Sequence, residues 1–347
     1  MAENYLYYGD NLDILRRYIR DESVDLVYLD PPFNSNQNYN VLFAEKSGTR
    51  STAQIKAFED TWKWDKAASD TYEQVVEAGG KTSEALQAFR QLLGPSDMLA
   101  YLVMMAPCLV ELRRVLKLTG SIYLHCDTTA SHYLKVLMDS ILGAQNFRNE
   151  IVWKRTSARS DSHKWNHIHD SILYYTKSDR YTWNPQYTVY DQKYIDKFYH
   201  FVESETGRRY ASDNLTASGT REGSSGASWH DINVRAKGIH WKYTIEGLEK
   251  LDREGRIIWP NKEGGVPRYK RYLDEMSGVA IQSMITDIPP LSAQSAEKLG
   301  YPTQKPLALL ERIIKASSNE GDMVLDPFCG CLCRVGGSIK CGKSHLN

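Results

Sequence analysis

The amino-acid sequence predicts an α/β fold whose doubly wound, mostly parallel sheet is interrupted by a long, loop-rich insertion. Strand-type and helix-type patterns alternate over residues 1–176, weaken over 177–295, and resume in a helix and a strand near the C-terminal end. Strands separated by helices form largely parallel sheets with helices on both faces. A chain of 347 residues is long enough for one large α/β domain with an insertion, or for two domains.

The first elements follow from short local patterns. A β-prone run predicts a short strand at residues 5–8, and apolar residues spaced three to four apart predict a helix over 11–19. The run SVDLVYL predicts a buried strand over 23–29 that ends abruptly at Asp30. Chemistry in open α/β sheets takes place at such strand ends.

A second group of elements is predicted in the following hundred residues. Apolar spacing predicts a helix over 97–118 that begins after Ser96 as N-cap, and Gly120 lies just past its expected end. A strand is expected at 121–125, followed by a helix over 129–142 that a glycine closes. This alternation supports the parallel sheet.

The remaining regular elements flank the insertion. Strands are expected at 150–153 and 171–175, before the irregular stretch of 177–295. Beyond it, a helix over 306–315 has proline in its first turn, and a strand is expected at 322–326. The insertion therefore lies between two parts of one sheet.

The balanced charge of the chain hides a local asymmetry. Lys+Arg and Asp+Glu both number 43, but residues 151–275 contain 21 of the former and 17 of the latter. The same segment has 19 of the 38 aromatic residues. Basic residues interleaved with aromatic ones suit a surface that follows phosphates and stacks on bases, although a solvated insertion gives the same composition.

Hydropathy and cysteine usage favour a cytoplasmic protein without a membrane partner. Mean hydropathy is −0.50, and no apolar run approaches the roughly 18 residues that a membrane span needs. The N-terminus has none of the basic and apolar regions of a signal peptide. Cys108 and Cys126 are expected to be core thiols. Four further cysteines crowd into the last nineteen residues: Cys329, Cys331, Cys333 and Cys341.

The sharpest chemical signal is the tetrad Asp30-Pro31-Pro32-Phe33 directly after a buried strand. An exocyclic amino group on a base is a poor nucleophile because its lone pair is delocalised into the ring. A carboxylate from Asp30 and the carbonyl of Pro31 could accept its two N–H groups, and Phe33 could stack on the extruded base. The tetrad alone is equally consistent with a turn that ends the strand.

A second acidic strand end lies near the other end of the chain. The strand over 322–326 ends in Asp326 and is followed by Gly330. Such a turn commonly binds a nucleoside cofactor, because glycine allows close approach of the backbone and the carboxylate meets a polar group. Two strand ends of one sheet can place cofactor and amino group side by side.

With these motifs in this order, the sequence resembles the β group of site-specific DNA amino-methyltransferases, which act on adenine N6 or cytosine N4. In that family the D-P-P-[YF] motif precedes the recognition region and the cofactor motif comes last. The matching stretches are Tyr8–Leu15, Val24–Asn36, Gly120–Asp127, Tyr301–Pro306 and Asp326–Gly330. They extend over nearly the whole chain.

The resemblance implies a role for particular residues. Asp30, Pro31, Pro32 and Phe33 would hold the target amine. S-adenosylmethionine would be the cofactor, bound by Asp10, Asn11, Thr303, Gln304, Lys305, Asp326, Pro327, Phe328 and Gly330. The basic residues expected to contact double-stranded DNA are Arg268, Lys270 and Arg271. The expected parts are a catalytic half at 1–176, a target-recognition region at 177–295, a cofactor-binding part at 296–331 and an aberrant tail at 332–347.

Several competing motifs have simpler explanations. Cys108 lies within a predicted helix, unlike the loop cysteine of cytosine-C5 methyltransferases, and Asp127 could cap a helix or support the site. His163, His167 and His169 lack partner ligands for zinc, so no metal is expected. Gly337–Ser344 matches a phosphate-binding loop but leaves no room for the helix that such a loop requires.

The sequence departs from the family after Cys331. Leu332 occupies the position of the motif's second glycine, and the following residues resemble neither the family nor a regular element. A truncation or a shifted reading frame would produce this pattern, and weak cofactor binding and poor methylation are then expected. A metal site formed by the late cysteines is the other reading of this tail.

Asp at the start of the tetrad favours adenine N6 over cytosine N4 as the target. The alternatives are a cytosine-N4 enzyme and a DNA-binding remnant that has lost catalysis. A homodimer and a companion restriction endonuclease are open at this stage, and the recognition sequence does not follow from these patterns.

Overall fold

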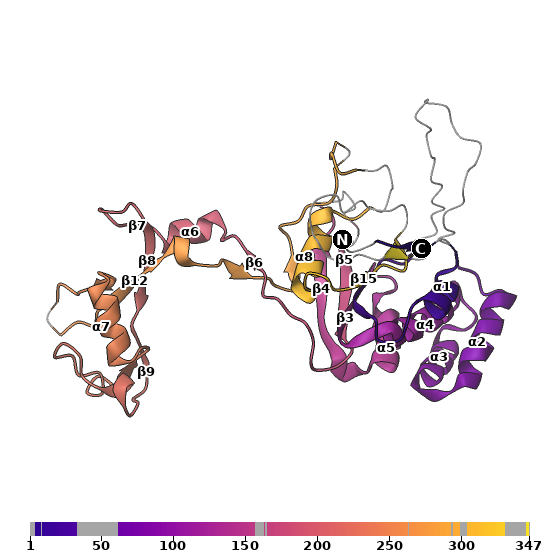
Figure 1. Cartoon of the computed structure of the whole chain (residues 1–347), viewed down its shortest axis with the longest axis horizontal. Coiled ribbons are helices and arrows are strands. Elements are labelled where there is room, and N and C mark those ends of the chain that lie inside the picture. The colour runs from indigo at the N-terminus through magenta and orange to yellow at the C-terminus, as the bar shows by residue number, and fades with distance from the viewer. Residues whose placement is uncertain are drawn as a thin grey trace. The chain divides into compact units, whose positions relative to one another are not determined.

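The chain folds into two compact units, Met1–Gln186 with Gln282–Asn347, and Tyr187–Ile281 (Figure 1). The structure is a computed structural model. It describes residues 4–7, 9–32, 62–156, 163, 165–262, 264–292, 294–298, 304–329 and 345–346.

The first unit is built on a six-stranded sheet. In spatial order its strands are β14 (Met284–Ile285), β4 (Phe147–Lys154), β5 (His169–Thr176), β3 (Leu116–Cys126), β2 (Val24–Leu29) and β15 (Val324–Leu325). Three of the five pairings are parallel, and β5 runs antiparallel to both of its neighbours. The predicted mostly parallel α/β sheet is confirmed.

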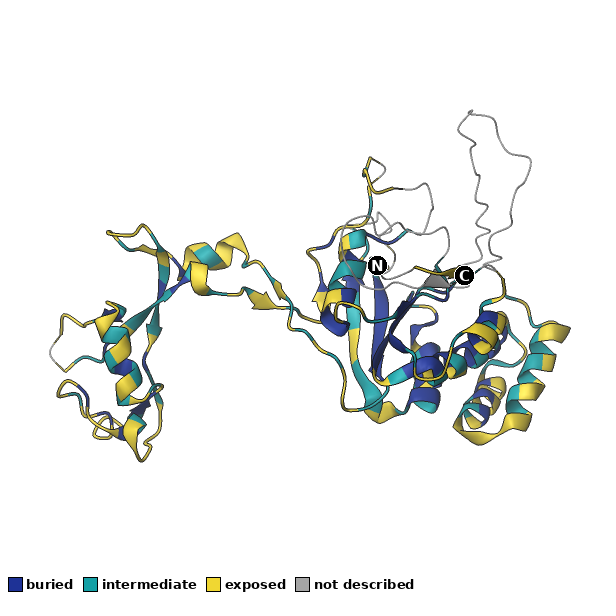
Figure 2. Ribbon diagram, viewed as in Figure 1, coloured by how far each residue is buried: buried dark blue, intermediate teal, exposed yellow. Residues whose placement is uncertain are grey.

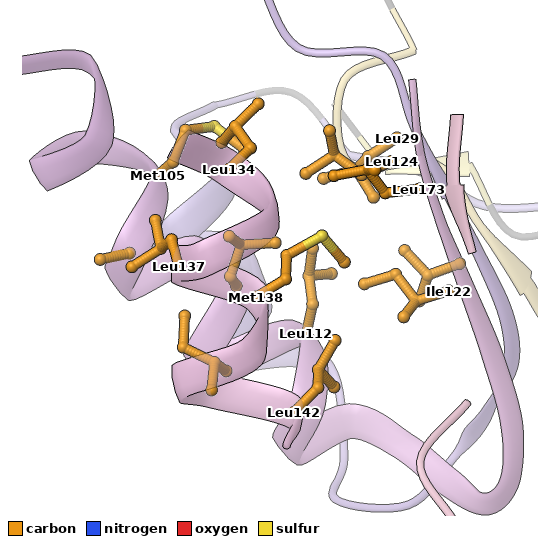
Figure 3. Packing of buried hydrophobic residues seen from close by; sticks show 14 of the residues in the cluster. Leu29, Met105, Leu112, Ile122, Leu124, Leu134, Leu137, Met138, Leu142 and Leu173 are labelled. Atoms are coloured by element: carbon orange, nitrogen blue, oxygen red, sulfur yellow. The ribbon is translucent and has the colours of Figure 1, made fainter. Parts of the chain in front are cut away.

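Helices cover both faces of this sheet, as the doubly wound prediction requires. One core cluster joins Val27 and Leu29 of β2 to α1 (Asn11–Tyr18), α4 (Asp97–Val115) and α5 (Ser131–Leu142). The other joins the alternate β2 residues to α8 (Leu307–Ser317). In Figure 3, labelled side chains of α4 and α5 face labelled side chains of β2, β3 and β5.

Buried residues are common in the strands of the first unit's sheet (Figure 2). All six residues of β2 are buried, which explains why its sequence is apolar at every position but one. The carboxylate of its one charged residue, Asp25, is paired with a cation and a backbone N–H group. Lys117 Nζ lies 2.8 and 2.9 Å from the two carboxylate oxygens, and the backbone N–H of Met323 donates to Asp25 Oδ2 at 2.9 Å. The carboxylate thereby ties β2 to the residue that precedes β15.

The prediction of a helix over 97–118 was wrong at its C-terminal end. The helix ends at Val115, and Leu116 already pairs with Val24 as the first residue of β3. Gly120, expected as a helix stop, lies inside β3 where its register with β2 shifts. A Cβ there would lie 2.7 Å from the Leu116 side chain, so the bulge needs glycine.

Other boundaries also differ from the sequence-based expectation. Two helices were not predicted, α2 (Lys66–Ala78), capped by Asp65, and α3 (Gly80–Leu93). Pro306 is the N-cap of α8, one position before the first turn. A final two-residue strand, β16 (His345–Leu346), pairs in parallel with β1 (Leu6–Tyr7), although no regular element was expected in the tail.

The second unit, Tyr187–Ile281, has its own sheet and core, and is more regular than the predicted loop-rich insertion. Trp229, Trp241 and Leu248 are central to its apolar cluster. Its main sheet has the order β11 (Ile257–Ile258), β12 (Arg268–Tyr272), β8 (Arg209–Asn214) and β7 (Phe201–Val202). The other elements are β6 (Tyr187–Thr188), α6 (Gln192–Phe198), β9 (Thr216–Ser218), β10 (Ile239–Trp241), α7 (Ile245–Arg253) and β13 (Val279–Ala280).

Strands β6 and β13 pair with each other, so the second unit starts and finishes at one two-stranded ribbon. The unit falls within residues 177–295, for which the sequence predicts the target-recognition region. Among the residues described, no helix has the length and apolarity to span a membrane.

Replacing Leu112 of α4 by alanine should destabilise the first unit by about 2–5 kcal/mol, because this fully buried side chain would leave a cavity against β3 and α5. Urea unfolding measures the loss. The control is Leu118→Ala, since Leu118 is 58 % exposed and its truncation should cost less than about 0.5 kcal/mol. Equal effects of the two changes would contradict the packing described.

Candidate active site

Polar side chains from five neighbouring strands and from the segment before α8 gather at one edge of the sheet. Strands β15, β2 and β3 are parallel, so their C-terminal ends meet there, and antiparallel β5 begins at the same edge. We call this group the polar row. Its members are Asp326 after β15, Asp30 after β2, Lys305 before α8, His125 near the end of β3, Asp170 near the start of β5, and Arg155 after β4.

The centre of the polar row is an ion pair between Lys305 and Asp30. Lys305 Nζ lies 2.5 Å from Asp30 Oδ2, and the lysine is only 8 % exposed. The other carboxylate oxygen, Oδ1, is buried and has no hydrogen-bond partner among the described residues. A buried acceptor without a donor is costly. One oxygen of Asp30 is therefore paired with Lys305, and the other accepts no hydrogen bond from the described residues.

A buried hydrogen-bonded chain lies beside this pair. The hydroxyl of Tyr28 lies 2.9 Å from His125 Nδ1, and His125 Nε2 lies 3.1 Å from Asp170 Oδ2. Arg155 forms an ion pair with the other carboxylate oxygen, because its Nη1 lies 3.4 Å from Asp170 Oδ1. A carboxylate only accepts, so the proton of His125 is on Nε2, and Nδ1 accepts from Tyr28.

The surroundings of His125 and Asp170 determine their charge states. Burial, reinforced by the nearby charge of Lys305, lowers the pKa of His125, so the imidazole is neutral. Burial acts to raise the pKa of Asp170, but the hydrogen bond from His125 and the charge of Arg155 outweigh it and lower that pKa. Asp170 is thus an ionised carboxylate held by a neutral histidine and a cationic arginine.

The second acidic strand end lies on the other side of Asp30 in the polar row. Asp326 Oδ1 accepts the backbone N–H of Phe328 at 3.0 Å, which shapes the turn after β15. Asn11 Nδ2 donates to the carbonyl of Pro327 at 3.4 Å. Asp10 caps α1 by accepting the N–H of Asp13 at 3.0 Å. Two sequence segments expected at the cofactor, from opposite ends of the chain, are therefore in contact.

Burial raises the pKa of Asp326 to about 7. The N–H of Phe328 opposes this rise, while the negative charge of Asp30 adds to it. Near neutral pH the carboxyl is thus close to its titration midpoint. A hydrogen-bond donor or a cation that entered this turn would favour the ionised form.

The structure places the remaining predicted residues unequally. Lys305, expected at the cofactor, is bound to Asp30, and Gln304 Nε2 donates to the carbonyl of Glu297 at 2.6 Å. Pro31 is buried and Pro32 is partly buried directly after Asp30. Phe33, Thr303 and Gly330 lie outside the described residues, so their expected roles remain predictions.

Two of the three residues expected to contact DNA are already paired within the second unit. Lys270 Nζ lies 2.7 Å from Glu203, and Arg271 lies 3.1 Å from Asp213. Arg268 donates to Ser212 Oγ at 2.8 Å. Contacts to phosphate by Lys270 or Arg271 would first have to break these pairs.

The surplus of Lys+Arg in residues 151–275 comes mainly from residues outside the second unit. Residues 187–281 have 15 Lys+Arg against 14 Asp+Glu, whereas residues 151–186 have 6 against 3. Most of the surplus therefore comes from β4, β5 and the residues next to them in the first unit.

Among the competing motifs, the two cysteines and Asp127 that the structure describes have structural roles. Cys108 and Cys126 are buried core thiols, as predicted, and burial raises the pKa of Cys108 to about 12. Asp127 Oδ1 accepts the N–H groups of Thr129 and Ala130, so it shapes the turn before α5. No group of three or more metal-ligating side chains occurs among the described residues. Gly337–Ser344, Cys331, Cys333 and Cys341 lie outside them.

Sequence reasoning missed Tyr28, His125, Asp170 and Arg155 as members of the site. A signal was present, because His125 and Asp170 are polar residues within otherwise apolar strand patterns. Their juxtaposition depends on β5 pairing antiparallel to β3, which no local pattern reveals.

A doubly wound sheet binds ligands at the carboxyl ends of its strands, where the two acidic strand ends of this chain lie side by side. The comparison with known proteins specifies the class. The chain belongs to the N6/N4 methyltransferase family described as DNA methylase, whose model matches residues 24–332.

Individual relatives agree with this membership. The chain is 28 % identical over 331 residues to the type II methyltransferase M.EcaI of Enterobacter cloacae, covering 95 % of this chain and 62 % of that protein. It is 26 % identical over 344 residues to the type III StyLTI Mod subunit of Salmonella typhimurium, covering 95 % and 48 %. The chain thus spans about half to three-fifths of the length of these relatives.

A further relative and a solved structure have similar coverage. The DNA adenine methyltransferase YhdJ of Escherichia coli is 23 % identical over 343 residues, covering 98 % of this chain and 76 % of that protein. A DNA modification methylase of Thermus thermophilus complexed with S-adenosylmethionine has a TM-score of 0.43 and 14 % identity, covering 99 % and 88 %.

A double-mutant cycle should show strong coupling between Asp30 and Lys305. Asp30→Asn or Lys305→Met alone leaves a buried charge without its partner, so the double variant should lose about 1–3 kcal/mol less stability than the two single losses combined. Urea unfolding of the four proteins gives the coupling. The Lys135–Asp139 pair of α5, more exposed and one helical turn apart, should show less than about 0.5 kcal/mol.

The stability of the Asp326→Asn variant relative to the parent should rise with pH. The folded pKa of Asp326, about 7, lies above its unfolded value, so this group stabilises the fold at acid pH and that contribution is lost as pH rises through 7. Asp326 keeps partial solvent access. The difference in unfolding free energy should therefore change by about 1–2 kcal/mol between pH 4 and 8. Thermal unfolding across this range measures it, with Asp322→Asn as control, and a flat difference would contradict the assignment.

Proposed function

We propose that this protein transfers a methyl group from S-adenosylmethionine to the N6 amine of adenine in double-stranded DNA. The observation that carries the proposal is the buried, unsatisfied Oδ1 of Asp30 at the edge of the sheet. Family membership supports DNA as the substrate. The target base must leave the helical stack to reach a carboxylate in this position.

The residues around Asp30 fit the activation of an aromatic amine. Oδ1 accepts one N–H of the target, and the carbonyl of Pro31 accepts the other, which draws the nitrogen toward tetrahedral geometry and frees its lone pair. Lys305 binds Oδ2, so the carboxylate is held in a fixed orientation. Phe33 is proposed to stack on the extruded base.

The turn after β15 is proposed to bind the cofactor. Asp326, Pro327 and Phe328 form the turn, Asn11 contacts it, and Asp10, Thr303, Gln304, Lys305 and Gly330 complete the set taken from the family motifs. Its position beside Asp30 at the same sheet edge fits a reaction between a bound cofactor and a base. The cofactor supplies an electrophilic methyl group on a sulfonium. The chain's own residues hold the amine in line with it and exclude water.

Two observations favour adenine over cytosine as the target base. The tetrad begins with Asp, and one of the matched relatives, YhdJ, is named as an adenine methyltransferase. Cytosine N4 is the competing assignment, since the same pocket accepts either amine.

Residues 1–176 and 296–331 are proposed to form the catalytic part, with 177–295 as the region that recognises the target sequence. Arg268 is the best-placed of the three predicted phosphate contacts, because it has no ion-pair partner among the described residues. A homodimer and a cognate restriction endonuclease are compatible with this proposal.

Asp30→Ala should abolish methylation while leaving cofactor binding intact. With radiolabelled S-adenosylmethionine and unmethylated genomic DNA, incorporation should fall by at least about 10³-fold, because the amine loses its acceptor. Asp127→Asn, which removes a carboxylate at the same sheet edge, is the matched control and should stay within about threefold of the parent. Chromatography of the digested DNA should show N6-methyladenine.

Two outcomes would contradict this proposal. N4-methylcytosine as the product would overturn the adenine assignment. Salt-dependent DNA binding without methyl incorporation by the parent protein would favour a DNA-binding remnant. Calorimetric titration with S-adenosylmethionine in the same series measures the weakened cofactor affinity that the sequence after Cys331 predicts.

A further inference from the structure

The connection between β4 and β5 leaves the sheet at the edge where Asp30 lies. Strand β5 is antiparallel to both β3 and β4, so β3 and β4 run in the same direction and finish at the same edge. The connection starts after Lys154, at the end of β4, and returns at His169, at the start of β5.

Both ends of the connection are fixed to residues of the site. The backbone N–H groups of Arg155 and Thr156 both donate to the carbonyl of Ile168, at 2.9 and 3.1 Å. The Arg155 guanidinium contacts Asp170 of the polar row. His167 Nδ1 lies 3.0 Å from the hydroxyl of Thr128, two residues past the end of β3. These contacts therefore hold the described ends of the connection at the same end of the sheet as Asp30.

Trp165 in this connection exposes 97 % of its surface, the largest exposed fraction among the exposed large hydrophobic residues. A tryptophan is usually buried for most of its area, so an indole exposed to this extent can stack on a flat partner. It is accompanied by exposed Lys154 at the end of β4, in the segment 151–186 that has most of the local positive surplus. An aromatic ring beside basic residues suits a polyanion that also offers flat faces for stacking.

We propose that Trp165 stacks on DNA bases next to the extruded target base, with Lys154 contacting the adjacent phosphate. Extrusion leaves a gap in the base stack, and an indole at this end of the sheet can fill it. The stacking replaces part of the lost base–base contact and so lowers the free-energy cost of extrusion. This assignment rests on the proposed function, in that it takes Asp30 as the acceptor site for the base.

The fluorescence of Trp165 tests this contact without requiring catalysis. Titration of the protein with unmethylated plasmid DNA should quench tryptophan emission, because stacking on bases quenches indole. The quench should shrink in Trp165→Phe, which removes only this reporter and keeps an aromatic ring. An equal quench in the parent and in Trp165→Phe would overturn the inference.

Steady-state methylation of the same plasmid supplies the second measurement. Trp165→Ala should lower kcat/KM for DNA by about 10- to 100-fold, Trp165→Phe should stay within about threefold of the parent, and the Kd for S-adenosylmethionine should be unchanged. The matched control is Leu118→Ala, an exposed apolar truncation at the opposite edge of the sheet, which should have no effect. Parent-like kcat/KM in Trp165→Ala would overturn the inference.

The two proposals fail in different ways. If the parent protein does not methylate DNA but its Trp165-dependent quench persists, the DNA contact stands and the catalytic proposal fails. If DNA causes no Trp165-dependent quench, and sedimentation shows a self-association that Trp165→Ala abolishes, the ring belongs to a protein interface and the inference is wrong.

Discussion

The ion pair between Lys305 and Asp30 is the contact on which the site depends. It neutralises one carboxylate oxygen at the end of β2 and leaves the other without a partner among the described residues. Removal of two charges from water is unfavourable unless geometry and neighbours compensate. Here the compensation comes from a sheet edge where Asp326 is only partly ionised near neutral pH, His125 is uncharged, and Arg155 balances Asp170. Uncompensated charge in the polar row is therefore small.

The second unit is a folded body with its own core, but it is nearly neutral. The sequence analysis found basic and aromatic residues in the same segment, but the structure distributes them differently. Aromatic residues are common in both units, whereas the positive surplus is concentrated around β4 and β5. Non-specific attraction to a polyanion and recognition of a particular sequence need not come from the same surface. The division of charge is consistent with such a separation in this chain.

The sequence predicted what is encoded locally. The buried strand before Asp30 and the helix after Pro306 follow from apolar periodicity, and the tetrad follows from its position at a strand end. The reversal of β5 and the pairing of His125 with Asp170 could not be predicted, because they depend on contacts between segments 45 residues apart. The role of Gly120 was misread for a related reason: in sequence a glycine after a helix and a glycine at a strand bulge look alike, and only the proximity of Leu116 distinguishes them.

The route of the chain through the sheet also has a kinetic consequence. Asp30 and Lys305 are separated by 275 positions, and β2 acquires its neighbour β15 only from the C-terminal region. Such distant contacts give the first unit a high contact order, and the entropy of closing this loop must be overcome before the pair forms. During synthesis the second unit can fold on the ribosome while the edge of the first sheet is still open. The Asp30 carboxylate therefore reaches its final environment among the last events of folding.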